Sequence, residues 1–402
     1  MRMPAVKYLC LVVFFVLAGP LRGEDFRYRY AAGDKYRILS TVNETVYIDG
    51  VLSHTAKILN RIAVEVTGVD GGSGIHSCTF QTSEEARGSH RVFSWGKIYE
   101  SVFSRDELGR YTIGEEYFMP IVRDVPVFMG RDVSEGESWS AGGEEVHDFN
   151  GSYRIQEAVR FPIQVTYTYT GREILDGEEY HVISIAYDVR HRPRFKSRPP
   201  GLYPVLITGY SRQKLFWDAR RGRPQAYEEE FDFVFQMSSG APVEYGGTAR
   251  ARIIDSAPMQ KEAVVEEIKN ALEDLGVADT EVRQDEFGVT LTLENIQFPP
   301  DSSVLIPAEQ EKLNRIGEIL NRYPDRDILI TGHTALAGTA EGRKKLSEDR
   351  AAAVGSYFIG KGIRGSERMA FRGLGAGVPL ADNSSSEGRA KNRRVEITIL
   401  EN

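Results

Sequence analysis

From residue 25 to residue 255 the chain alternates hydrophobic and polar residues with a period of two, the spacing of side chains on one face of a β-strand. The clearest runs are 58–66, 163–170 and 181–189. Turns rich in glycine and aspartate follow at 69–74, 175–177 and 217–222. We therefore expect residues 24–255 to form an all-β antiparallel region of one or two sandwich-like modules, without helices and with a break near 120–126.

The second face of these strands carries charge. In the run 58–66, Ile58 and Ile62 share one face, whereas Arg61 and Glu65 lie on the other, which we expect to face solvent, as we do for Asp188. Charged outward positions favour a soluble sandwich. Alternation by itself also fits a membrane-spanning barrel, so that alternative stays open.

After residue 255 helical periodicity alternates with short apolar runs. Helical stripes cover 258–275, 307–323 and 339–361, and strand-like runs cover 282–283, 289–293, 328–330, 369–372 and 394–400. Ser256 and Pro258 predict the start of the first helix, and Gly276 predicts its end. We expect a separate α+β domain over 256–402, with helices on one side of a small mixed sheet, so the whole chain is multidomain.

Arg350 stands out on the helix predicted over 339–361. It falls in the middle of an apolar face that includes Leu346, Val354 and Phe358. A cation on a buried face needs an anionic partner, because desolvating an unpaired charge costs several kcal/mol. That partner is either an internal carboxylate or a ligand carboxylate, which a guanidinium can grip with two hydrogen bonds.

A series of motifs surrounds Arg350. They are Phe298, Asp301-Ser302, Gly332-His333-Thr334, Gly338, Leu346-Ser347, Arg350-Ala351, Gly373, Gly375 and the run EGRAKNRRVEI at 387–397. In this order and spacing they resemble the OmpA-like domain, the peptidoglycan-associated C-terminal module of Gram-negative envelope proteins, over about residues 258–402. The resemblance implies the α+β fold and a site for the peptidoglycan stem peptide. The matching site residues are Arg350, Asp301, Thr334 and Arg393.

The sequence departs from this family at the cation-binding half of the site. In the family, an aspartate after Gly-His-Thr holds the amino group of the diaminopimelate stem residue, and the arginine matching Arg350 holds its carboxylate. Here Ala335 replaces that aspartate, Arg343 replaces the asparagine that follows eight positions later, and Ala376 replaces an acidic residue. The resemblance therefore implies that peptidoglycan binding is weakened or altered.

The first residues have the pattern of a secretory signal. Basic Arg2 and Lys7 precede an apolar run at 8–18 that is too short to span a bilayer. We expect residues 1–23 to be removed and no lipid to be attached, because Cys10 lies inside the apolar run. The mature chain then holds one cysteine, Cys78, which we expect to be a buried strand thiol. The expected location is the periplasm, with association to the outer membrane left open.

Signatures of enzymes are absent from the sequence. The seven histidines show no paired metal-ligand spacing, no G-x-S-x-G motif occurs, and the glycine-rich turn at 71–74 opens no helix. We expect His333 to be a turn residue hydrogen-bonded to backbone. A net charge of −8 gives no reason to expect a nucleic-acid partner.

The function expected from the sequence is that of a non-enzymatic cell-envelope protein with no metal and no cofactor. Its OmpA-like domain would bind peptidoglycan weakly, and its β-rich half would contact other envelope proteins. The alternative is a structural or protein-interaction module that no longer binds peptidoglycan.

Overall fold

The computed structural model describes residues 23–85, 92–196, 199, 201–255, 259–294, 298 and 302–401, without the side chains of 151 and 152. The predicted secretory segment with Cys10, the predicted helix-start residues Ser256 and Pro258, and the predicted site residue Asp301 lie outside these residues. The elements of the first half are β1 Lys35–Ile48, β2 Val51–Asp70, β3 Ser73–Glu85, β4 Phe93–Arg105, β5 Tyr111–Ile113, β6 Val122–Arg123, β7 Ser138–His147, α1 Asn150–Tyr153, β8 Val159–Leu175, β9 Glu178–His191, β10 Pro204–Asp218, β11 Arg223–Met237 and β12 Pro242–Asp255.

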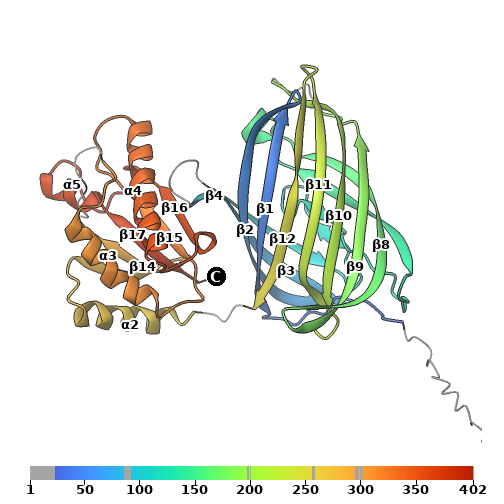
Figure 1. Ribbon diagram of the computed structural model, residues 1–402, viewed down its shortest axis with the longest axis horizontal. Coiled ribbons are helices and arrows are strands. Elements are labelled where there is room, and N and C mark those ends of the chain that lie inside the picture. Colours follow the sequence, from blue (N-terminus) through green and yellow to red (C-terminus); the bar gives the residue numbers. More distant parts are fainter. Residues whose placement is uncertain are drawn as a thin grey trace, which may run out of the picture.

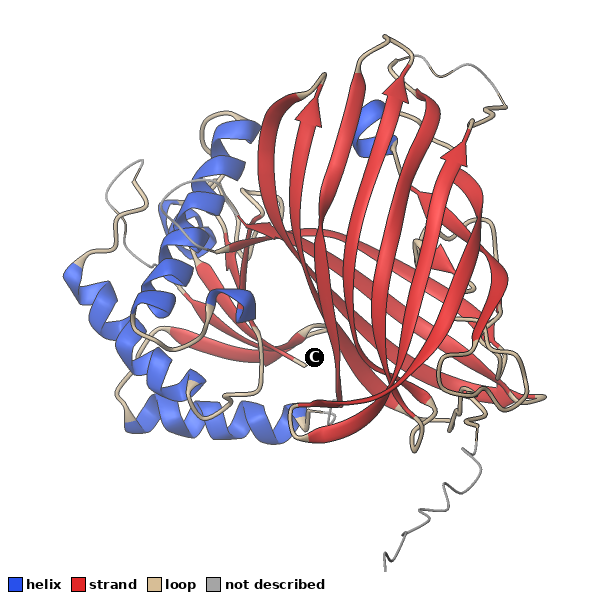
Figure 2. Cartoon of the chain, turned by 45° about the vertical axis from the view of Figure 1, so that its right-hand side comes forward, coloured by secondary structure: helices blue, strands red, loops and turns tan. Residues whose placement is uncertain are grey.

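These strands form one antiparallel sheet that curls on itself (Figures 1 and 2). The order is β5–β4–β3–β2–β1–β12–β11–β10–β9–β8–β7–β6, and the pairing of β12 with β1 joins the two ends of the chain segment. The antiparallel all-β prediction is confirmed. The expected break near 120–126 falls where the chain crosses from β5 to β6, the two end strands of the sheet.

The inner face of the curled sheet carries the core of this half. Its largest buried side chains are aromatic, among them Phe26, Tyr28, Phe128, Trp139, Tyr167 and Trp217. Along β11 the predicted alternation is visible, because Phe235 is buried whereas Glu228 and Glu230 are exposed. Cys78 is buried, as expected. The prediction of no helix is wrong at α1, a single turn that is too short to produce a helical pattern in the sequence.

The second half is an α+β unit. Its elements are α2 Lys261–Asp274, β13 Thr280–Gln284, β14 Gly288–Leu293, α3 Pro307–Leu320, β15 Ile328–Gly332, α4 Ala340–Gly360, the 3-10 turn Ser366–Arg368, β16 Met369–Gly373, α5 Ser386–Asn392 and β17 Val395–Leu400. The sheet order is β13–β14–β17–β15–β16, with β15 and β16 parallel and the other pairs antiparallel. Helices α2, α3 and α4 pack on one face of this sheet, which confirms the predicted α+β architecture (Figure 1).

The predicted helix boundaries hold with one correction. Helix α2 begins at Lys261, with Gln260 as its N-cap, and not near residue 258 as predicted. Capping signals in sequence locate a helix start only approximately. Among the described residues, we find no helix long and apolar enough to cross a membrane.

The two halves are joined by strand pairing. Phe93 and Ser94 at the start of β4 pair in parallel with Ala370 and Phe371 of β16. Val92, just before β4, is fully buried in the core of the second half. Its side chain would lie 3.2 Å from a Cβ placed on Gly355 of α4, so the side chain packs closely against the helix at this glycine. The first half therefore contributes both an edge strand and a core side chain to the second.

A buried ion pair reinforces this junction and corrects the sequence prediction for Arg61. Arg61 is 8% exposed, and its Nε donates to Oδ2 of Asp327 at 2.9 Å. Oδ1 of Asp327 accepts from Nε of Arg368 at 3.0 Å. Period two places Arg61 on the outer face of β2, but it cannot reveal that the second half covers that face. Glu65 and Asp188 have exposed side chains, as expected.

Candidate functional site

The candidate site lies where β15 and β16 end against α4. A Cβ on Gly332 would lie 2.0 Å from the carbonyl oxygen of Ser347, and one on Gly373 would lie 2.4 Å from the amide nitrogen of Glu348. Only glycine tolerates such a close approach of helix backbone to strand backbone. As a result, Oγ of Ser347 reaches the loop after β16 and accepts a hydrogen bond from the amide of Gly375 at 2.9 Å.

Arg350 lies one turn after Ser347 on α4 and is 8% exposed. Its Nε donates to the carbonyl oxygen of Ser302 at 3.1 Å, and its guanidinium lies 5.0 Å from the ring centroid of Phe298. Arg350 also has interactions beyond these two. The predicted burial of this cation is confirmed. Its pairing with Asp301 stays a prediction, because Asp301 lies outside the described residues.

The buried face of α4 differs from the predicted one. Its buried residues are Ser347, Arg350, Ala351, Ala352, Val354, Gly355 and Phe358, whereas Leu346, Ala353 and Tyr357 are only partly buried. Arg350 therefore lies at the edge of the buried face and not at its centre. The sequence analysis centres the buried face on large apolar residues, but the close packing of α4 against Gly332 and Gly373 selects small ones.

Thr334 and Ala335 lie two and three residues after the end of β15 and are both 6% exposed. The Thr334 amide donates to the carbonyl oxygen of Gly375 at 2.9 Å, and the Leu336 amide donates to Oδ1 of Asn383 at 2.9 Å. Oγ1 of Thr334 has no hydrogen-bond partner within the described part of the chain. The loop backbone is thus fixed on both sides of Ala335, which presents a methyl group where the resemblance implies a carboxylate.

The two other predicted arginines lie at the margins of this loop. Arg343 is half-buried in the first turn of α4, and its guanidinium donates to the carbonyl oxygen of Gly338. Arg393 is exposed at the C-terminal end of α5. It is held near the loop because the carbonyl oxygen of the next residue, Arg394, accepts from the amide of His333 at 3.0 Å. The structure thus brings Thr334 and Arg343 close to Gly375, with Ala335 next to Thr334 in the chain, and leaves Arg393 at the surface.

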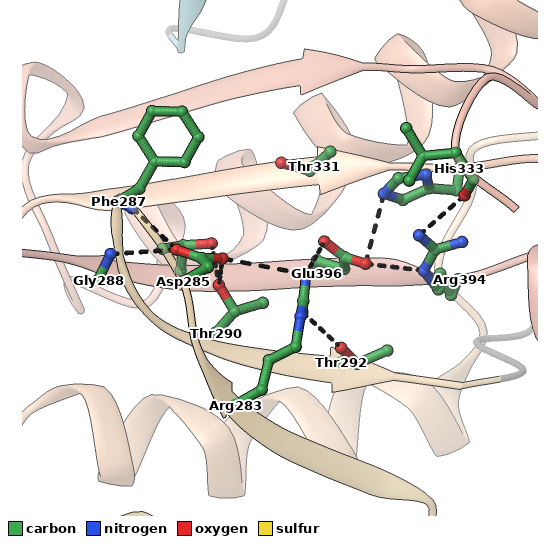
Figure 3. A network of polar contacts seen from close by, with 12 residues as sticks. Arg283, Asp285, Phe287, Gly288, Thr290, Thr292, Thr331, His333, Arg394 and Glu396 are labelled. Atoms are coloured by element: carbon green, nitrogen blue, oxygen red, sulfur yellow. Dashed lines mark hydrogen bonds and ion pairs between the residues drawn. The ribbon is translucent and has the colours of Figure 1, made fainter. Parts of the chain in front are cut away.

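Glu396 is the centre of a buried polar network on the sheet face opposite the helices (Figure 3). Nε of Arg394 donates to its Oε1 at 2.8 Å, and Nη2 of Arg283 donates to its Oε2 at 3.1 Å. Nε2 of His333 lies 3.6 Å from Oε1. Burial alone would raise the pKa of Glu396, but His333 and Arg394 together lower it to about 2.

The His333 ring plays a different part from the predicted one. Its backbone amide is hydrogen-bonded as expected, but neither ring nitrogen has a hydrogen-bond partner among the described residues. Burial, followed by nearby Arg394 and Arg372, lowers the pKa of His333 despite the adjacent Glu396. We conclude that the His333 ring is neutral near pH 7. Arg283 and Arg394, which are hydrogen-bonded to Glu396, supply the positive charge that balances the Glu396 carboxylate. The network locks β17 beside the site loop.

Sequence reasoning missed two residues that shape the site. Asn392 at the end of α5 is 1% exposed; its Oδ1 accepts from the amides of Leu380 and Ala381, and its Nδ2 donates to the carbonyl oxygen of Ala381. Ser347 bridges α4 to Gly375. Both belong to motifs recognised in the sequence, but nothing in a motif distinguishes a loop-shaping side chain from a ligand-binding one. Among the described residues, no cluster of His, Cys, Asp or Glu could hold a metal ion.

Comparisons with known proteins concern this second half. The sequence model of the OmpA family matches residues 297–393. Peptidoglycan-binding protein ArfA of Mycobacterium tuberculosis is 42% identical over 104 residues, which make up 26% of this chain and 32% of that protein. Outer membrane protein A of Bordetella avium is 39% identical over 103 residues, 26% of this chain and 53% of that protein.

One solved structure extends the comparison. The crystal structure of the peptidoglycan-associated lipoprotein from Burkholderia pseudomallei is 30% identical, with a TM-score of 0.24, and covers 26% of this chain and 88% of that chain. The chain spans about a third to about half of the length of the two curated relatives above. Residues 297–393 of this chain are an OmpA family domain.

Proposed function

We propose that this chain is a non-enzymatic cell-envelope protein whose OmpA family domain associates weakly with the peptide stems of peptidoglycan. Arg350 is the observation that carries the proposal, because this arginine is 8% exposed, with its guanidinium held against Ser302 and Phe298. A guanidinium held in this way suits a carboxylate of the stem. The match to the OmpA family and the similarity to a peptidoglycan-binding protein support the same assignment.

The proposed binding is weak because half of the site is missing. Ala335 offers a buried methyl group to the ammonium of a diaminopimelate-type residue, and Arg343 adds a positive charge nearby. A hydrogen bond to a charged group contributes about 1.5–3 kcal/mol, so its loss should weaken binding by roughly 10- to 150-fold relative to a complete site. In this proposal Arg350, Thr334 and Arg393 serve the anionic part of the ligand, with Asp301 as a further family position.

Calorimetric titration with a diaminopimelate-containing stem peptide tests the proposal. We expect Ala335→Asp to bind at least about 10-fold more tightly than the wild type, and Arg350→Ala in that background to abolish binding. Ala337→Asp is the matched control, because it adds the same charge to an exposed position of the same loop. If Ala335→Asp and Ala337→Asp behave alike, the half-site explanation is wrong.

A second function is favoured by the junction between the two halves. The edge strand β16 is already paired with β4, and Val92 fills the core of the domain. Such close packing of the two halves suits a structural module of the envelope that has lost the ability to bind peptidoglycan. Failure of both the wild type and Ala335→Asp to bind the stem peptide would favour this alternative.

The proposal includes export to the periplasm, on the strength of the signal pattern at residues 1–23, and leaves association with the outer membrane open. It assigns contacts with other envelope proteins to the β-rich half. N-terminal sequencing of the protein recovered from the envelope tests export, and we expect the mature chain to begin near Glu24 without a lipid.

A further inference from the structure

The curled sheet of the first half encloses a cavity of about 700 Å³. Its wall is largely aromatic and aliphatic, with Leu215, Phe231, Phe233, Phe235 and Tyr245 among its members. Phe231 and Phe233 keep partial contact with solvent, so the cavity is open to the outside. A cavity of this size with an apolar wall is typical of sites for small molecules.

Small residues on one strand create this space. On β12, Ala249 and Ala251 face the interior opposite Glu229 and Tyr227 of β11. The outer positions of β11, Glu228 and Glu230, are exposed and polar, so the apolar character is confined to the inside. The cavity therefore follows from the choice of side chains on the inner face of the sheet.

Glu145 and Glu229, two of the four acidic residues that line this space, come from different strands. Glu145 of β7 is 2% exposed, and its Oε2 lies 2.6 Å from Nε2 of His147. Its Oε1 has no hydrogen-bond partner of ordinary geometry in the described part of the chain. Oε1 of Glu229 accepts from Oγ of Ser211 at 2.7 Å and from Nε2 of Gln213 at 3.3 Å.

The acidic cluster lacks a permanent cation. Within the described residues, neither Glu145 nor Glu229 forms an ion pair with lysine or arginine. Burial raises the pKa of Glu229, and the charge of Glu145 adds to that effect. Two carboxylates in an apolar cavity repel each other, so a bound cation would relieve both the repulsion and the desolvation cost.

The cavity lining also includes two arginines, and both have partners: Arg252 forms an ion pair with Asp176, and Arg105 lies among tyrosines. Its Nε and Nη1 donate to the hydroxyls of Tyr30 and Tyr111, and its guanidinium lies 3.9 Å from the ring centroid of Tyr28. These tyrosines already satisfy the cation by hydrogen bonds and by stacking. Within the described lining of the cavity, the carboxylates of Glu145 and Glu229 therefore lack a lysine or arginine partner, and a bound cation would neutralise them.

We infer that this cavity binds an apolar molecule carrying one protonated amine, with the ammonium between Glu145 and Glu229 and the apolar body against the aromatic wall. An ammonium offers three donors, one of which can serve the unpartnered Oε1 of Glu145. The surrounding Phe and Tyr rings favour a cation over a neutral head group. This site is separate from the OmpA family domain, so it would give the protein a second binding activity besides the proposed binding of peptidoglycan.

Titration calorimetry of the whole protein with decylamine tests this inference, with decanol and decanoate as head-group controls. We expect decylamine to bind at least about 10-fold more tightly than either control, because a charge-assisted hydrogen bond is added to the same apolar contact. Glu145→Gln should weaken decylamine binding by about 10-fold or more and leave decanol binding unchanged. Glu228→Gln is the matched control on the outer face and should change neither.

A second variant tests the location. Ala251→Trp should fill the cavity and weaken binding of decylamine and decanol alike, while thermal unfolding reports whether the variant remains folded. The inference is overturned if decanoate binds most tightly, which would point to Arg105, or if all three ligands bind equally. It is also overturned if decylamine does not bind, or if Glu145→Gln behaves as Glu228→Gln does.

Discussion

Replacing Asp327 by asparagine should strongly destabilise the junction between the two halves. The change removes one negative charge and keeps the size of the side chain. Asp327 is 2% exposed and receives hydrogen bonds from Arg61 and Arg368 at 2.9 and 3.0 Å. Removing one partner of a buried ion pair costs about 3–5 kcal/mol, because the other charge remains buried without compensation.

The structure favours the lower end of this range. The Arg368 side chain is 30% exposed and can turn toward water. Arg61 cannot, but it keeps hydrogen bonds to Gln81, Ser83 and the carbonyl oxygen of Glu367. We therefore expect a loss of about 3 kcal/mol in the free energy of unfolding.

Urea unfolding at pH 7, followed by tryptophan fluorescence and circular dichroism, measures this loss. Trp95 reports on the junction, because the Arg61 guanidinium lies 5.9 Å from its ring centroid. Asp325→Asn is the matched control, since Asp325 is exposed and lies two residues away. A difference of less than about 0.5 kcal/mol between the two variants would show that the buried ion pair does not stabilise the junction.

The effect should also depend on pH. Burial alone would raise the pKa of Asp327, but Arg61 and the other nearby arginines lower it below its ordinary value of 3.8. A carboxylate with a lowered pKa stabilises the folded state above its unfolded pKa and loses that contribution as pH falls through its folded pKa. The difference between Asp327→Asn and the wild type should therefore shrink below about pH 4.

Three further predictions concern single features. Glu396→Gln should lower the free energy of unfolding by up to about 3 kcal/mol at pH 7, and this loss should shrink as pH falls from about 4.5 toward 2, because the pKa of Glu396 is lowered to about 2. Urea unfolding over a range of pH measures the loss, and a loss that does not change with pH would contradict the lowered pKa. Cys78 should react with iodoacetamide only on unfolding, because burial raises its pKa to about 12; rapid labelling of the native protein, followed by mass spectrometry, would disprove this. A fragment of residues 256–402 should fold alone but should melt at a lower temperature than the same domain in the whole chain, because the fragment lacks Val92 and the pairing with β4. An unfolded circular-dichroism spectrum would contradict folding of the fragment, and an equal melting temperature would contradict the contribution of the first half.

The elements of the second half could be predicted because their signals are local. Helical stripes such as 307–323 and apolar runs such as 328–330 need no knowledge of distant contacts, and both appear in the structure as α3 and β15. The site loop could be located for the same reason, since Gly332 and Gly375 belong to short motifs. In the structure Thr334 is hydrogen-bonded to Gly375, whereas Arg393 lies at the surface and Asp301 lies outside the described residues.

Contacts between distant segments could not be predicted. Arg61 was assigned to solvent because its partner, Asp327, is 266 positions away and belongs to the other half. The centre of the buried face of α4 was misplaced because backbone contact at Gly332 and Gly373, and not side-chain hydrophobicity, decides which residues face the sheet. Closure of β12 on β1, and the cavity that results, likewise depends on pairing across the whole first half.

In the function proposed above, the OmpA family domain keeps the anion-binding half of its site and lacks the cation-binding half. The most direct measurement is co-sedimentation with purified peptidoglycan sacculi over a range of protein concentrations, for the wild type and Ala335→Asp. We expect weak binding of the wild type and roughly 10- to 150-fold tighter binding of Ala335→Asp. Equal binding of the two proteins, at any affinity, would contradict the proposal.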